Sequence, residues 1–152
     1  MYEGIVEENL QYEAILVDKT QDTTSNRSGT SASIKDLLKK ATTEMLVLFV
    51  LRFKPMYTYE MMNLIEQISG GVLTFNTLYQ AVYRLQKFHY IFEANKTISE
   101  DNRLRVYFSI TAEGRVYFEQ LVAEYRTVTD VIDNILARET LDLANLEGED
   151  RK

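Results

Sequence analysis

The spacing of apolar residues along the chain predicts helices first and a change of period later. Residues near 43–53 are apolar almost all round, which is typical of a helix enclosed by partners, and Thr42 or Thr43 can cap its start. A second helix is expected to begin at Thr58 as N-cap and to end at the glycine pair 70–71, because its apolar residues recur at three-and-four spacing.

A third helix is expected to start with Thr74 as its N-cap, and the single histidine, His89, is of the kind that ends a helix favourably through its dipole. After His89 the spacing of the apolar residues changes from the helical period of 3.6 residues to the strand period of 2. In residues 91–97 and 104–111, apolar and polar side chains alternate or the residues are β-branched and aromatic. Turn-forming residues 99–102 separate the two segments. These two segments are therefore predicted to pair as a β-hairpin.

A last helix is expected over residues 112–140, capped by Thr111. Its apolar residues step by 3, 4, 3, 4 and 3 and so form the a/d seam of a coiled coil: Phe118, Leu121, Tyr125, Val128, Ile132 and Ile135. The seam could pack on the chain's own domain. A helix that follows a hairpin has little of its own domain left to cover, however, so the pattern favours self-association.

The chain divides into four parts by composition. Residues 18–33 contain a single apolar residue, Ala32, and cannot bury enough surface to offset their ordering entropy. We therefore expect an N-terminal arm and polar linker over 1–33 and a folded domain over 34–111. The helix over 112–140 and an acidic tail over 141–152 complete the chain.

Composition excludes much of enzyme chemistry. The 152 residues suffice for one domain, and they include no cysteine and one histidine. Thiol catalysis, disulfides, zinc fingers and metal sites that need several imidazoles are thereby excluded, and we expect a non-enzyme without metal or cofactor. The longest apolar run, 45–51, is far too short to span a bilayer, so we expect a cytoplasmic protein without membrane contact.

The formal net charge of −6 is distributed unevenly. Residues 1–35 hold three basic and six acidic side chains, residues 36–112 hold nine and seven, and residues 113–152 hold five and ten. Only the middle of the chain is basic. Because charges act mainly within a Debye length of about 10 Å, a basic centre between acidic ends is compatible with a DNA-reading module.

The order of elements is that of a winged helix-turn-helix followed by a dimerisation helix, a mainly α fold with a small β-hairpin. Four motifs occur in order at the spacing of a known family: 57–61 (YTYEM), 76–80 (NTLYQ), 102–108 (NRLRVYF) and 110–114 (ITAEG). With these motifs the chain resembles the PadR family of bacterial transcriptional regulators. Asn76, Gln80 and Asn102 stand where the family has glycine, proline and glycine.

The resemblance implies a homodimer that binds double-stranded DNA, with the a/d residues at the dimer interface. The candidate DNA-binding residues lie on the second helix, the third helix and the wing: Tyr59, Thr74, Asn76, Thr77, Tyr79, Gln80, Arg84, Arg103 and Arg105. Glutamine suits adenine, and arginine suits guanine or phosphate. Thr74 could instead merely cap its helix, and Arg103 and Arg105 could form a solvated hairpin tip.

The function expected from these observations is a transcriptional repressor that binds a pseudo-palindromic operator. In some family members aromatic residues such as the one at the position of Tyr125 line a cavity for planar aromatic or cationic effectors, so the resemblance also implies release by a small effector, with an aromatic one expected. The alternative is a winged-helix protein-interaction module that no longer binds DNA. The acidic total and the replaced wing glycine favour that alternative.

Overall fold

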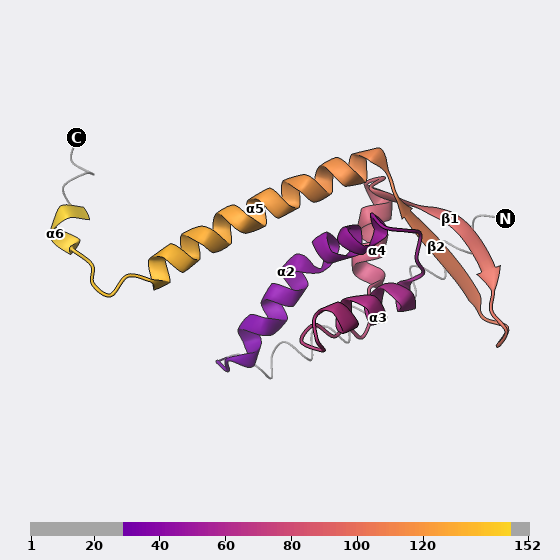
Figure 1. The fold of residues 1–152 in the computed structure, drawn as a ribbon, viewed down its shortest axis with the longest axis horizontal. Coiled ribbons are helices and arrows are strands. Elements are labelled where there is room, and N and C mark those ends of the chain that lie inside the picture. Colours follow the sequence, from indigo (N-terminus) through magenta and orange to yellow (C-terminus); the bar gives the residue numbers. More distant parts are fainter. Residues whose placement is uncertain (1–28, 147–152) are drawn as a thin grey trace.

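The computed structural model describes residues 29–146 (Figure 1). The elements run in the order α2, α3, α4, β1, β2, α5 and α6. The expected winged helix, mainly α with one antiparallel hairpin, is confirmed. Most of the predicted arm and the end of the acidic tail, residues 1–28 and 147–152, lie outside the described residues.

The first helix, α2, spans Ala32–Leu51, so the predicted start near residue 43 is wrong. Thr42 and Thr43 lie inside the helix rather than at its N-cap. Their hydroxyls donate to the carbonyls of Leu38, at 2.7 Å, and Lys39, at 2.6 Å. This back-bonding satisfies a threonine within a helix, so the residue type did not mark an end.

The second helix, α3, spans Thr58–Ile68, and its N-cap is Tyr57 rather than the predicted Thr58. Its predicted end at the glycine pair is confirmed. Gly70 and Gly71 have φ of 61° and 81°, and their amides donate to the carbonyls of Gln67 and Glu66 at 3.2 and 2.9 Å. This pattern is a Schellman motif, which requires a left-handed residue after the helix.

The third helix, α4, spans Tyr79–Lys87, so the predicted N-cap at Thr74 is wrong. Residues 72–78 form a connection instead, in which the Thr74 carbonyl accepts a bond of 2.8 Å from Lys39 Nζ. The threonine oxygen near the helix start is that of Thr77, which accepts from the Tyr79 amide at 3.2 Å. The segment contains two threonines with capping chemistry, Thr74 and Thr77, so the residue type alone does not identify the one at the helix start.

The wing consists of strands β1 (Ile91–Ile98) and β2 (Leu104–Ile110), which pair antiparallel and confirm the predicted hairpin. A bulge between Glu93 and Asn95 interrupts the register. The backbone of Met56 bonds to that of Phe108 in both directions, at 3.1 and 2.9 Å, as a one-residue third strand. This bridge holds the start of α3 against the base of the wing.

The long helix α5 spans Ala112–Leu136, and the predicted cap is confirmed because Thr111 Oγ1 accepts from the Gly114 amide at 2.9 Å. The helix ends before the predicted residue 140 and is followed by a short helix, α6 (Leu143–Leu146). Figure 1 shows α5 running beside α2 and then extending beyond the winged helix, with α6 at its far end.

The hydrophobic core lies where the end of α2 meets α3, α4, the base of the wing and the start of α5. Its largest fully buried side chains come from all of these but α5: Val47, Leu48, Val50, Met56, Met61, Ile65, Leu78, Leu85 and Ile91. Phe118 of α5 joins this core at 5% exposure, and Leu121 packs against it. The first third of the a/d seam therefore covers the chain's own domain, contrary to the expectation that little of that domain was left to cover.

Candidate nucleic-acid interface

The solvent-facing side of α4 is the candidate reading surface. Ala81, Val82 and Leu85 are buried in the core, which turns the opposite side of the helix to solvent. That side carries Tyr79, Gln80, Tyr83 and Lys87, all exposed. The helix contains two basic residues and no acidic one. It can therefore approach a phosphate backbone without repulsion from its own side chains.

Two residues of this face, Tyr83 and Lys87, were not among the sequence-predicted DNA contacts. A signal for them existed, because the three-and-four spacing of Ala81, Val82 and Leu85 places them on the opposite face. The predicted contacts Thr74, Asn76 and Thr77 lie in the connection before α4, not in its first turn. The structure therefore divides the contacts predicted for the third helix between the connection before α4 and α4 itself.

Arg84 lies at the edge of the α4 face and has an acidic partner. Its Nε donates to Glu44 Oε1 of α2 at 2.7 Å. The other carboxylate oxygen of Glu44 accepts from the Tyr117 hydroxyl of α5 at 3.5 Å. Burial, followed by the negative charge of Glu44, raises the pKa of Tyr117, so the phenol stays a neutral donor. One carboxylate thus joins three helices.

An open groove of about 430 Å³ lies along this ion pair. It is lined by residues of α2, α4 and α5: Leu37, Lys40, Ala41, Glu44, Arg84, Tyr117 and Leu121. The Tyr117 ring stacks on Tyr90 with centroids 4.2 Å apart, which fixes the side of the groove formed by α5. The groove combines apolar walls with one carboxylate and two cations.

The start of α3 carries the predicted contact Tyr59, whose side chain is exposed in the first turn of the helix. Beside it, Glu60 forms an ion pair with Lys54, and this hydrogen bond raises the pKa of the Lys54 ammonium. The Lys54 ammonium stays protonated, and the carboxylate of Glu60 offsets its positive charge. Tyr59 remains the group at this end of α3 that is free to meet a DNA backbone.

The two arginines of the wing differ in their surroundings. The Arg105 guanidinium lies over the ring of Tyr57 at 4.7 Å and so ties the wing to the start of α3. Arg103 is at the tip, with 83% of its side chain exposed, and its Nε is 3.5 Å from Asp101 Oδ2. A hydrogen bond from Ser99 lowers the pKa of Asp101 and keeps that carboxylate charged. Of the two arginines, Arg103 is the more accessible to DNA, because its side chain lies at the tip and does not pack on α3.

The far half of α5 presents apolar side chains to solvent. Tyr125, Val128, Ile132 and Ile135 of the predicted seam are all exposed, together with Val131 and Leu136. The first half of α2 is exposed in the same way, at Ile34, Leu37 and Leu38. Exposed apolar surface of this extent marks an interaction site.

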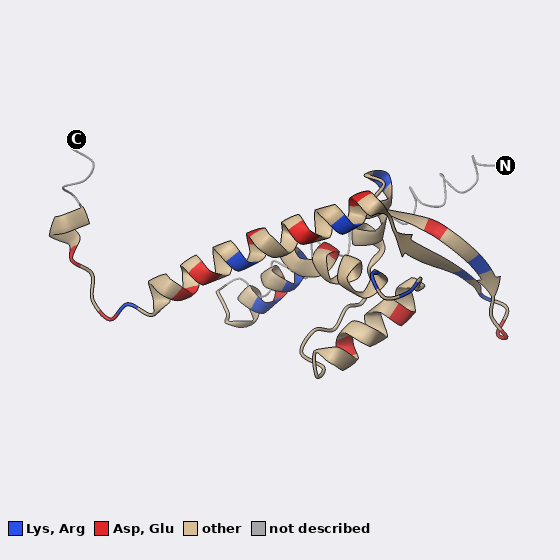
Figure 2. Cartoon of the chain, turned by 45° about the horizontal axis from the view of Figure 1, so that its top comes forward, with Lys and Arg blue, Asp and Glu red and all other residues tan. Residues whose placement is uncertain are grey.

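The solvent-facing side of α4 and the helix α5 differ in charge. The helix α5 contains five acidic and two basic residues, which Figure 2 shows as a predominance of red along it. The α4 helix has only basic charge. Electrostatics therefore favour DNA at α4 and disfavour it along α5.

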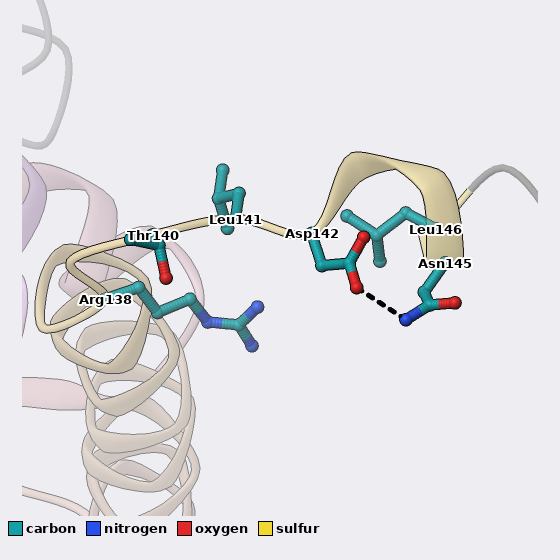
Figure 3. Close-up of a pocket in the computed structure, with 6 residues that line it drawn as sticks. All are labelled: Arg138, Thr140, Leu141, Asp142, Asn145 and Leu146. Carbon is teal, nitrogen blue, oxygen red and sulfur yellow. Dashed lines mark hydrogen bonds between the residues drawn. The ribbon is translucent and has the colours of Figure 1, made fainter.

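A second cavity, of about 290 Å³, lies beyond the end of α5 (Figure 3). Its walls are the exposed residues Arg138, Thr140, Leu141, Asp142, Asn145 and Leu146, and Asn145 donates to Asp142 at 2.6 Å. It holds none of the predicted site residues. Within residues 29–146, no group of acidic or histidine side chains is placed to hold a metal ion, and no helix has the length and apolarity to cross a membrane.

Comparison with known proteins agrees with this geometry. Residues 47–120 match the profile of the family described as Transcriptional regulator PadR-like family. A transcriptional regulator from Clostridium thermocellum is similar in structure, with 27% identity, 64% of this chain and 95% of that chain covered, and a TM-score of 0.56.

Two further structures share the fold. A PadR-like transcriptional regulator from Bacillus cereus has 23% identity, coverage of 66% and 96%, and a TM-score of 0.54. A PadR family regulator from Eggerthella lenta has 22% identity, coverage of 71% and 89%, and a TM-score of 0.56. No curated protein matches the sequence. Residues 47–120, just under half of the chain, therefore carry the signature of the PadR-like transcriptional regulators, a class of regulator that binds DNA.

Proposed function

We propose that the chain acts as a homodimeric repressor that places α4 of each copy in the major groove of a pseudo-palindromic operator. The observation that carries this proposal is the exposed basic face of α4, with Gln80, Tyr83 and Lys87 free of partners from the core. Two such helices would have to lie about 34–36 Å apart to enter adjacent major grooves. Arg103 at the wing tip would meet the neighbouring minor groove or its phosphates.

Self-association is supported by the exposed far half of α5. A valine- or leucine-sized side chain gains roughly 1.5–3 kcal/mol when it is buried from full exposure. Val128, Ile132 and Ile135 are about half exposed, so covering each of them in a dimer would gain about half of that amount. A second copy is the occupant that supplies a matching a/d seam. The exposed apolar residues of α2 offer further surface to the same partner.

Repression follows from occupancy, because a dimer on two adjacent grooves of a promoter excludes other proteins from it. A small aromatic effector would release the DNA by changing the spacing between the two α4 helices. Such an effector must favour one spacing over the other to have any effect. This part of the proposal rests on the family resemblance alone.

Titration of labelled DNA from upstream of the chain's own gene tests the proposal. The dimer should bind with sequence preference at low salt, and Gln80→Ala should cost roughly 1–3 kcal/mol on the preferred sequence if Gln80 reads a base. Gln67→Ala, an exposed glutamine near the end of α3, is the matched control and should bind as wild type does. Absence of DNA binding by an intact dimer would favour the alternative of a protein-interaction module.

A further inference from the structure

The ion pair between Arg84 and Glu44 removes a cation from the edge of the α4 face. Arg84 is the more exposed partner, with 63% of its side chain accessible, whereas Glu44 is 20% accessible. Their contact of 2.7 Å joins residues 40 positions apart in the sequence. The same carboxylate is held from its other side by the Tyr117 hydroxyl. The less exposed Glu44 carboxylate is therefore contacted from two sides, and the more exposed Arg84 side chain is one of its two partners.

The position of Arg84 on the helix places it close to the DNA-facing side. It follows Gln80 by four residues, so the two side chains lie on neighbouring parts of the same helical surface. An arginine side chain at this edge is long enough to contact a phosphate when nothing else holds it. The Glu44 carboxylate carries the same charge as a phosphate and offers similar acceptor oxygens, so the two compete for one guanidinium.

We propose that Glu44 is a positioning residue that holds Arg84 away from DNA phosphates and thereby keeps the sequence-independent affinity of the protein low. The inference rests on the proposed function, since it assumes that α4 meets DNA. In the protein without DNA, Arg84 is therefore paired with Glu44 and is not available to contact a base or a phosphate. DNA binding is then left to the central residues of the α4 face and to the wing tip.

A salt titration on non-specific DNA tests this inference without knowledge of the operator. Each phosphate that a protein neutralises steepens the slope of log K against log salt by about 0.9. In Glu44→Gln the freed Arg84 should add one such contact. The affinity of this variant for a short random-sequence duplex should therefore fall about 3.5-fold more than that of wild type between about 50 and 200 mM salt.

Three further variants separate this effect from others. Glu44→Gln/Arg84→Gln should return to the wild-type slope, because the gained contact belongs to Arg84. Arg84→Gln alone should also keep the wild-type slope, and it remains informative if Glu44→Gln does not fold. Glu119→Gln makes the same change of net charge on α5, where the carboxylate is exposed and 4.0 Å from Arg52, and should leave the slope unchanged.

The outcomes distinguish this inference from the proposed function. A Glu44→Gln slope equal to that of wild type overturns the inference, and so does a flatter slope in Arg84→Gln, which would mean that Arg84 already touches DNA. Either result leaves the regulator proposal intact if wild type binds its upstream DNA. Conversely, binding gained by Glu44→Gln and lost again in the double variant supports the inference even if wild type does not bind.

Discussion

Gly114 lies at the contact between the first turn of α5 and the backbone that enters the wing, and Gly114→Ala should destabilise the protein. A Cβ atom at this position would lie 2.0 Å from the Tyr90 carbonyl oxygen and 2.9 Å from Ile110 Cγ1. Neither neighbour is the free end of a flexible side chain. The same Tyr90 oxygen accepts a bond of 3.0 Å from the Thr111 amide, so moving it also weakens the N-terminal anchor of α5.

The magnitude follows from three terms. Overpacking of this kind costs about 1–3 kcal/mol, and the weakened hydrogen bond costs about 1 kcal/mol. Alanine is the better helix former by about 1 kcal/mol, which offsets part of the loss. The net expectation is about 2 kcal/mol, against a total stability on the order of 5–15 kcal/mol. The melting temperature should fall by roughly 8 °C.

Urea and thermal unfolding followed by circular dichroism measure this loss, at one fixed protein concentration because dimerisation would add to stability. Gln120→Ala, an exposed position on the same helix, is the control and should change stability by less than about 0.5 kcal/mol. If Gly114→Ala were as stable as this control, the close approach of α5 to Tyr90 would be wrong.

Three other perturbations test separate parts of the molecule. Val128→Glu/Ile132→Glu, on the exposed half of the seam, should give monomers in sedimentation at tens of micromolar; a monomeric wild type would contradict the proposed dimer. Arg103→Ala should flatten the salt slope of DNA binding by about 0.9, whereas Arg105→Ala should lower melting temperature as well, because Arg105 stacks on Tyr57; equal behaviour would contradict the distinction. The pKa of Tyr117 is raised above its ordinary value of 10.0, so the neutral phenol stabilises the fold fully below pH 10, and this contribution is lost as pH rises through the folded pKa. Tyr117→Phe should therefore lose less stability than wild type between pH 9 and 11. Parallel curves of stability against pH would refute a role for this phenol.

The fold could be predicted from the sequence where the residue type favours a single local structure. The glycine pair after α3, the turn residues of the wing and the Thr111 cap each have a backbone conformation or hydrogen bond that few other residues supply. Threonine elsewhere was ambiguous. Thr42 and Thr43 bond back inside α2, and Thr74 precedes α4 without capping it, since a threonine hydroxyl is satisfied in several ways.

His89 illustrates a different limit of sequence reasoning. It follows the end of α4, as expected, and its backbone conformation forms the end of the helix. With φ of 62° it occupies the left-handed position of a Schellman motif, where the amide of Tyr90 bonds to the Leu85 carbonyl at 2.8 Å. The glycine pair performs the same role after α3. A histidine at this position costs about 1–2 kcal/mol of backbone strain. Histidine adopts positive φ more often than most residues, but its residue type predicts that conformation far less clearly than glycine does.

The candidate site could be predicted in location but not in electrostatics. Periodicity places Gln80 on the outer face of α4, and the same rule, applied to its neighbours, also identifies Tyr83 and Lys87. It cannot reveal that Arg84 is held by Glu44, because the partner lies 40 residues away on another helix. The basic total of the middle segment therefore overstates the charge available to DNA, since Arg84, Lys54 and Arg103 each have an acidic neighbour. What distinguishes the reading face is the absence of acidic residues along α4, which leaves Lys87 as its unneutralised cation among the described contacts.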